Sequence, residues 1–191
     1  VGAFVGWNQN TRSNEGLEVK VSAAYGRKDL SLTRSAVGTA ESGQGNSALS
    51  TLLAEATVTY GFQMDERTLA APFAGLRYGK VSNGGYTEGA GVFSPLTFGQ
   101  TSQTAQSVMA GLNLNIKPQG PVGLELSGGL EHYLKIDAAK LSATGIDGLG
   151  AVQMTPAMSK DRPFASASLR YEVAKNQQVL LGVSHSRLFG S

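Results

Sequence analysis

The stretch APFAGLRYGKVSNGGYTE, residues 71–88, decides the fold class of this chain. Its first half alternates, so that Ala74, Leu76 and Tyr78 fall on one face of a strand and Arg77 falls on the other with its glycine neighbours. Its second half is rich in asparagine, glycine and threonine, which is typical of a polar loop. The stretch therefore predicts a strand with one apolar face that leads into a long loop.

The same two-residue period recurs along the whole chain, whereas helical spacing is weak. The apolar positions of seven further runs extend from Val1 to Trp7, Val19 to Tyr25, Leu52 to Phe62, Val108 to Ile116, Val122 to Leu130, Ala165 to Val173 and Val179 to Val183. The last run can also be assigned in its other register. We therefore expect an all-β, antiparallel, up-and-down sheet of about eight strands in a single domain over residues 1–191.

The alternate face of these runs is small and polar. Its charged members are Lys20, Glu55, Arg77, Glu125, Glu131, Arg170 and Glu172. In a soluble barrel the apolar face would form the core, and in a transmembrane barrel it would face lipid. Alternation alone leaves both interpretations open.

Composition narrows the choice. Charged residues are only 16% of the chain, below the roughly one quarter that is usual in soluble domains. No stretch approaches the ~20 consecutive apolar residues of a spanning helix. The net charge of +2 and the lack of a basic run longer than Arg27-Lys28 argue against nucleic-acid binding. The absence of cysteine excludes disulfides and thiolate chemistry and fits export through an oxidising compartment.

Two further patterns favour the membrane. Aromatic residues stand at the ends of the apolar runs, as girdles at two membrane interfaces would: Trp7, Tyr25, Tyr60, Phe62, Tyr78 and Tyr171. Short connections at 63–68, 117–121 and 174–178 alternate with long ones at 34–50, 81–105 and 137–161. Outer-membrane barrels place tight turns on the periplasmic side and long loops outside. Together the patterns predict a transmembrane β-barrel with its apolar face toward lipid.

Residues 71–91 and TSQTAQSVMAGLNL (101–114) resemble the translocator barrel of type V autotransporters, and VGAFVGW (1–7) and residues 161–184 are also similar to it. The shared features are a Pro-aromatic-Ala-Gly-Leu strand, a Gly-aromatic-Thr-Glu loop and a Thr-Ser stretch before the next Gly-Leu strand. The resemblance implies the outer membrane of a Gram-negative bacterium, with no cofactor. It also implies export and anchoring of an N-terminal passenger through a hydrated lumen, and insertion by the barrel-assembly machinery.

Strand parity sharpens this expectation. If the short turns are periplasmic, both ends of the chain lie on the outer side, whereas an intact barrel has an even strand number and periplasmic ends. The family's barrel has twelve strands, so three strands before Val1 and one after Ser191 would restore parity. We therefore expect a partial barrel. The alternative is a self-contained eight-stranded barrel with a structural or adhesive role through its long loops.

Catalytic chemistry finds little support in the sequence. The only histidines are His132 and His185, near separate strand ends, and Ser184 and Ser186 point to the opposite face from His185. An outer-membrane enzyme or a soluble ligand-binding barrel are therefore weaker alternatives, and no metal, calcium or phosphate-binding motif occurs. The one site prediction is that the seven charged residues listed for the polar face line a lumen, either in contact with a passing segment or paired among themselves.

Overall fold

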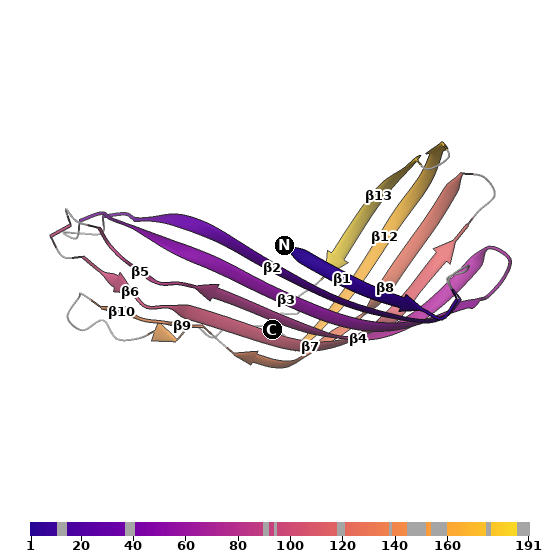
Figure 1. The fold of residues 1–191 in the computed structure, drawn as a ribbon, viewed down its shortest axis with the longest axis horizontal. Coiled ribbons are helices and arrows are strands. Elements are labelled where there is room, and N and C mark those ends of the chain that lie inside the picture. The colour runs from indigo at the N-terminus through magenta and orange to yellow at the C-terminus, as the bar shows by residue number, and fades with distance from the viewer. Residues whose placement is uncertain are drawn as a thin grey trace.

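The computed structural model describes residues 1–10, 15–36, 41–89, 92–93, 95–117, 121–137, 139–144, 152–153, 160–174 and 177–186. Eight long strands form one antiparallel sheet in chain order (Figure 1). These are β1 (Gly2–Asn8), β2 (Gly16–Arg34), β3 (Gly43–Gln63), β4 (Thr68–Asn83), β7 (Thr101–Ile116), β8 (Val122–Asp137), β12 (Asp161–Ala174) and β13 (Gln177–Ser186). The all-β, antiparallel, up-and-down prediction is confirmed.

The sheet curves into a half-barrel with β1 and β13 as its two edges. Among the described residues these edge strands pair only with β2 and β12, so the closed eight-stranded ring of the self-contained alternative is not found. β1 runs toward a short turn and β13 runs away from one, which places both edges in the orientation expected from strand parity.

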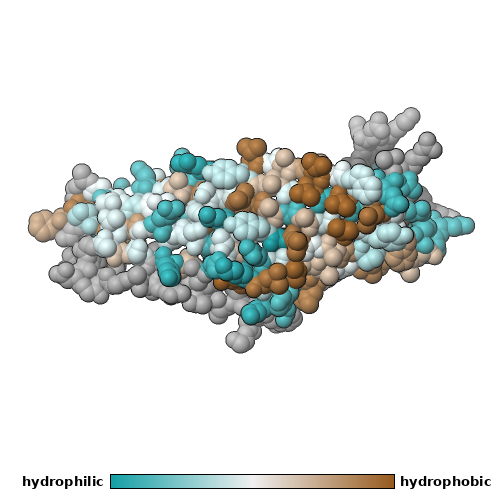
Figure 2. Space-filling model, turned by 60° about the horizontal axis from the view of Figure 1, so that its bottom comes forward, coloured by the Kyte–Doolittle hydropathy of each residue, from teal (hydrophilic) through white to brown (hydrophobic). Residues whose placement is uncertain are grey.

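The apolar positions face outward on the convex side and remain exposed. Val5 is 74% exposed, Leu76 60% and Val183 70%, and only six apolar residues of the described chain are buried. Figure 2 shows hydrophobic side chains gathered in a band across this surface, with hydrophilic residues on either side of it. A soluble barrel would enclose these side chains, so this exposure overturns the soluble interpretation.

The exposed aromatic residues lie where the girdle prediction placed them. Trp7 and Tyr171 lie toward the short turns, and Tyr25 lies toward the long loops, and each is about half exposed. Tyrosine and tryptophan favour a boundary that is apolar at one end and wet at the other. We call the convex side, with Leu76 and these aromatics, the outer face and the opposite side the inner face.

From β3 onward short and long connections alternate as expected, but the expected loop boundaries were wrong, and the connection between β2 and β3 (35–42) is about as short as the one between β1 and β2 (9–15). Residues 43–50 belong to β3, residues 81–83 to β4 and residues 101–105 to β7. Their serine, glycine and asparagine content is typical of loops, yet the ladder of backbone hydrogen bonds continues through them. Strand pairing needs only backbone groups, so polar sequence outside the membrane did not end these strands.

A small sheet covers the far ends of β2 and β3. It consists of β5 (Tyr86–Thr87), β6 (Thr97–Phe98) and β10 (Ala143–Thr144), and β9 (Lys140–Leu141) pairs with β11 (Val152–Gln153) nearby. We call β5, β6, β10 and the described residues 84–89, 92–93 and 95–100 the loop layer (Figure 1). It lies on the inner face, where the Tyr86 ring covers Gly45 and the Glu88 carboxylate covers Gly43.

Candidate functional site

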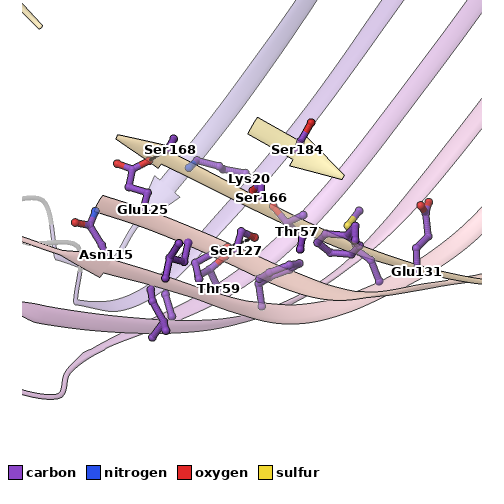
Figure 3. Close-up of a pocket in the computed structure, with 18 of the residues that line it drawn as sticks. Lys20, Thr57, Thr59, Asn115, Glu125, Ser127, Glu131, Ser166, Ser168 and Ser184 are labelled. Carbon is purple, nitrogen blue, oxygen red and sulfur yellow. Dashed lines mark hydrogen bonds between the residues drawn. The ribbon is translucent and has the colours of Figure 1, made fainter. Parts of the chain in front are cut away.

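The inner face holds a hollow of about 800 Å³ lined by residues from β2, β3, β4, β7, β8, β12 and β13. Five of the seven predicted site residues line it: Lys20, Glu55, Arg77, Glu125 and Glu131. Figure 3 shows several of them on the same side of the sheet among serine, threonine and asparagine side chains. The structure therefore brings most of the predicted set together around one polar hollow.

The remaining two predicted residues differ from each other. Arg170 forms an ion pair with Glu125 across the β8–β12 pair, so it joins the same surface. Glu172 is exposed close to the short turn, where its backbone N–H donates to the carbonyl oxygen of Pro121 at 2.8 Å. Glu172 does not line the hollow, because β12 carries it past the end of the polar surface.

Arg77 is the centre of the largest group of polar contacts. Its Nη2 lies 2.8 Å from Glu55 Oε2 on β3, and its Nη1 lies 3.2 Å from Glu131 Oε1 on β8. Glu131 is almost completely buried at 3% exposure, and Ser107 Oγ donates to its Oε1 at 2.6 Å. A buried carboxylate requires such donors, because removal from water without them is costly.

Arg162 extends this group to the edge of the sheet. Its Nη1 lies 3.7 Å from Glu131 Oε2, and its Nη2 donates to Ser186 Oγ at 2.6 Å. We call the resulting set the transverse network: Glu55, Arg77, Ser107, Glu131, Arg162 and Ser186. These residues come, in order, from the six long strands β3, β4, β7, β8, β12 and β13. The network links six neighbouring strands and crosses the inner face obliquely, because Glu131 and Ser186 lie in successive rows on the short-turn side of Arg77.

A row of aromatic rings and glycines lies on the short-turn side of Arg77 and Glu131. Phe73 stands opposite Gly111, Gly111 opposite Gly129, and Gly129 opposite Phe164. The two ring centroids are 6.2 Å apart. A Cβ added at Gly111 would lie 2.7 Å from Phe73 Cζ, and one added at Gly129 would lie 2.7 Å from Phe164 Cζ. Only glycine leaves room for the rings to lie flat against the wall.

Further polar pairs continue toward the short turns. Ser127 Oγ donates to Asn113 Oδ1 at 2.7 Å, and Lys20 Nζ lies 2.8 Å from Glu18 Oε1. The inner charges are therefore largely paired with one another across and along the strands. Ion pairs that are partly exposed are screened by solvent, so each contributes less to stability than the buried carboxylate does.

The long-loop end contains a second buried ion pair. Arg34 Nε lies 2.7 Å from Glu88 Oε1, and the backbone N–H of Leu96 donates to Glu88 Oε2 at 3.0 Å. The Glu88 side chain has no exposed area. The hydrogen bonds from Arg34 and Leu96 lower the pKa of Glu88, and the hydrogen bond to Glu88 raises the pKa of Arg34. Burial raises the pKa of Tyr86 beside them.

Comparison with known protein families agrees with a membrane β-barrel. The family model described as "Autotransporter: Autotransporter beta-domain" matches residues 1–184. The chain belongs to the autotransporter beta-domain family. No relative was found among curated proteins. Membership confirms the resemblance, and it makes the chain a translocator domain of the Gram-negative outer membrane, a type of domain that transports and does not catalyse.

The histidines of this beta-domain lie apart from the inner carboxylates. His132 Nδ1 lies 2.7 Å from Asp161 Oδ1 on the outer face, and His185 faces outward opposite Ala165. Within the described ranges, no three His, Asp or Glu side chains are placed to hold a metal ion. The same part of the chain has no helix that is both long and apolar enough to cross a bilayer.

Sequence reasoning missed Arg162 and Glu18 on the inner face, and it gave Ser107, which it placed on the polar face, no part in the site. The signal for Arg162 was present, because it continues the polar positions Ser166, Ser168 and Arg170 of the same strand by two more steps. The expected strand began at Ala165, whereas β12 begins at Asp161. The buried pair of Arg34 and Glu88 falls in sequence that was expected to be loop.

Proposed function

We propose that this beta-domain exports and anchors an N-terminal passenger through a hydrated lumen, and that its inner face is the wall of that lumen. The observation that supports the proposal is that the apolar face lies outside and the polar face lies inside, the reverse of a soluble barrel. The outer face exposes Leu76 and Val183, whereas the inner face carries the transverse network around a polar hollow. Charged groups within a membrane are stable where they pair and stay hydrated.

In this proposal six of the seven predicted residues have a lining role. Lys20, Glu55, Arg77, Glu125, Glu131 and Arg170 would contact the segment that joins the passenger to the barrel, and Glu172 would mark the periplasmic end. Further strands beside β1 and β13 would complete a twelve-stranded ring, which removes the exposed edges that lipid does not tolerate. The partners would be the lipid bilayer, the chain's own passenger segment and the barrel-assembly machinery, and no nucleic acid.

Cysteine labelling tests the lumen directly, because the chain contains no cysteine of its own. In the full-length protein in intact outer membranes, Ser127→Cys faces inward and Leu126→Cys beside it faces outward. We expect a charged maleimide to label Ser127→Cys, and to label it less when the uncleaved passenger segment is retained. Leu126→Cys should stay unlabelled, because the charged reagent does not enter lipid.

The same variants report on transport. A bulky maleimide on Ser127→Cys should reduce the amount of passenger that an external protease can reach, and the outward variant should not. Equal labelling of both faces, or labelling that does not depend on the passenger, would contradict a water-filled export path.

A further inference from the structure

The outer face is chemically different at its two ends. Toward the short turns, its described strand residues carry no charged side chain and are mostly aromatic or aliphatic, as at Trp7, Tyr60, Phe62 and Tyr171. Toward the long loops, the outward positions include three cations, Arg27, Lys80 and Lys135. Asp29, Asp137 and Asp161 lie on the same end of the outer face. A membrane with identical leaflets would not require this asymmetry.

Lys80 and Lys135 belong to one continuous patch. In the register of the sheet, Lys80, Thr104 and Asp137 form one row across β4, β7 and β8. Tyr78, Gln106 and Lys135 form the next row toward the membrane. We call these six residues the rim patch. The two lysines are two strands apart and one row apart, which corresponds to about 12 Å, so they can contact groups on a single head group.

A β-bulge creates half of this patch. Ser107 pairs with Tyr133, but Gln106 pairs with Lys135, so Leu134 is the extra residue on β8. Residues directly opposite each other share a face, so Tyr133 faces inward whereas Lys135 and Asp137 face outward. Without the bulge, Lys135 would face inward. Bulges commonly redirect side chains at functional positions.

The charges of the patch favour an anion with hydroxyl groups. Lys135 Nζ lies 3.1 Å from Asp137 Oδ2, which also accepts from Thr104 Oγ1 at 2.7 Å. Two lysines and one aspartate leave the patch with a net positive charge, and among the described residues no acidic group pairs with the exposed Lys80. Gln106 adds amide donors and acceptors, and each ammonium has three donors.

The position of the patch selects the kind of anion. Leu76 and Leu134, 60% and 59% exposed, lie directly beside it on the apolar band, where acyl chains would pack. The outer leaflet of a Gram-negative outer membrane carries phosphorylated glycolipids, whereas the inner leaflet carries phospholipids. We propose that the rim patch binds the phosphorylated saccharide head group of an outer-leaflet glycolipid. Lys80 and Lys135 contact its phosphates, and Gln106 and Tyr78 contact its sugar hydroxyls.

Native mass spectrometry of the full-length protein in mild detergent tests this assignment, with lipid A and phosphatidylglycerol as the probes. We expect lipid A to bind more tightly than phosphatidylglycerol. Each lysine contributes about fivefold near an anionic surface, so Lys80→Gln with Lys135→Gln should weaken lipid A binding on the order of 30-fold. Lys117→Gln removes the same charge at the short-turn end and should change nothing.

A variant of opposite sign keeps the test decisive if the double variant does not fold. Asp137→Asn removes the competing anion and should strengthen lipid A binding about fivefold. Unchanged binding in both patch variants, an equal loss in Lys117→Gln, or phosphatidylglycerol binding as tight as that of lipid A would overturn the proposal. Passenger export should remain normal in these variants, so this result is independent of the lumen experiment.

Discussion

The membrane-spanning part of the sheet and its long-loop end use the same strands in opposite ways. In the spanning part, apolar side chains such as Leu76 face outward and the inner face holds the transverse network. At the long-loop end, the inner side of β2 and β3 is covered by the loop layer, which buries Leu96 and Ala143. The comparison teaches that the medium on each side, and not the strand itself, decides which face is apolar.

The largest effect should come from charging the lipid-facing side of the spanning part. Leu76→Arg places a charge within the apolar band and should destabilise the protein by about 2–4 kcal/mol, because lipid cannot solvate it. Thr59→Arg adds the same side chain on the inner face opposite Glu18, where its cost should stay below about 1 kcal/mol. Urea-induced unfolding of the full-length protein in lipid vesicles measures both.

Equal costs for Leu76→Arg and Thr59→Arg would break the comparison, because the two faces would then meet the same medium. A large cost for Thr59→Arg alone would mean that the inner face is closely packed and not hydrated.

Glu131 tests whether the transverse network stabilises the spanning part. Glu131→Ala leaves Arg77 and Arg162 with one acceptor fewer each, and should cost about 2 kcal/mol. The expected cost is below that of a fully buried pair, because Arg77 is 40% exposed and water can replace part of the contact. Glu172→Ala removes an exposed carboxylate and should leave the urea midpoint unchanged. Equal effects of the two variants would show that the network adds nothing.

The glycine row sharpens the same point at the level of packing. Gly111→Ala should cost about 1–2 kcal/mol, because its Cβ would press on the Phe73 ring and on the carbonyl oxygen of Gly128. Gly123→Ala is the matched control, since the nearest atom to its added Cβ is Arg170 Cβ at an ordinary 3.7 Å. A cost at Gly123 equal to that at Gly111 would indicate a general loss on substituting glycine and no role for the aromatic contact.

The sequence predicted the spanning part far better than the long-loop end. The period of two separated the two faces of most runs, so the sequence already placed Lys20, Glu55, Arg77 and Glu131 on one surface. Periodicity could not show that Glu131 would be buried by Ser107 and Arg162, because that contact depends on register between strands distant in sequence.

Two features had no local signal. The bulge at Leu134 shifts the inward and outward positions of β8 by one residue from Lys135 onward. No residue type in that stretch indicates where an extra residue falls. The loop layer pairs β6 with β5 and with β10, which is distant in sequence, and its sequence resembles any polar loop. Its order comes from the pairing of Arg34 with Glu88, 54 residues apart, which a period-based analysis does not detect.

The smallest effect on overall stability, and the most local one, should come from Glu88. The pKa of Glu88 is lowered by its hydrogen bonds to Arg34 and Leu96, so the carboxylate favours the folded loop layer wherever it is ionised. The contribution is complete above the ordinary pKa of a glutamate and disappears as the pH falls through the lowered value. The protection factors of β5 and β6, in which the exchange rates are corrected for the slower intrinsic amide exchange in acid, should therefore stay high at neutral and mildly acidic pH and fall only in stronger acid. Glu88→Gln should show low protection of β5 and β6 already at neutral pH and should lose the dependence of this protection on pH. The control Glu66→Gln, at a short turn, should behave as the unmodified protein. Protection that falls in acid equally with and without Glu88 would mean that the loop layer is held by its apolar contacts, as a soluble core is. The contrast between the loop layer and the membrane-spanning part would then become stronger.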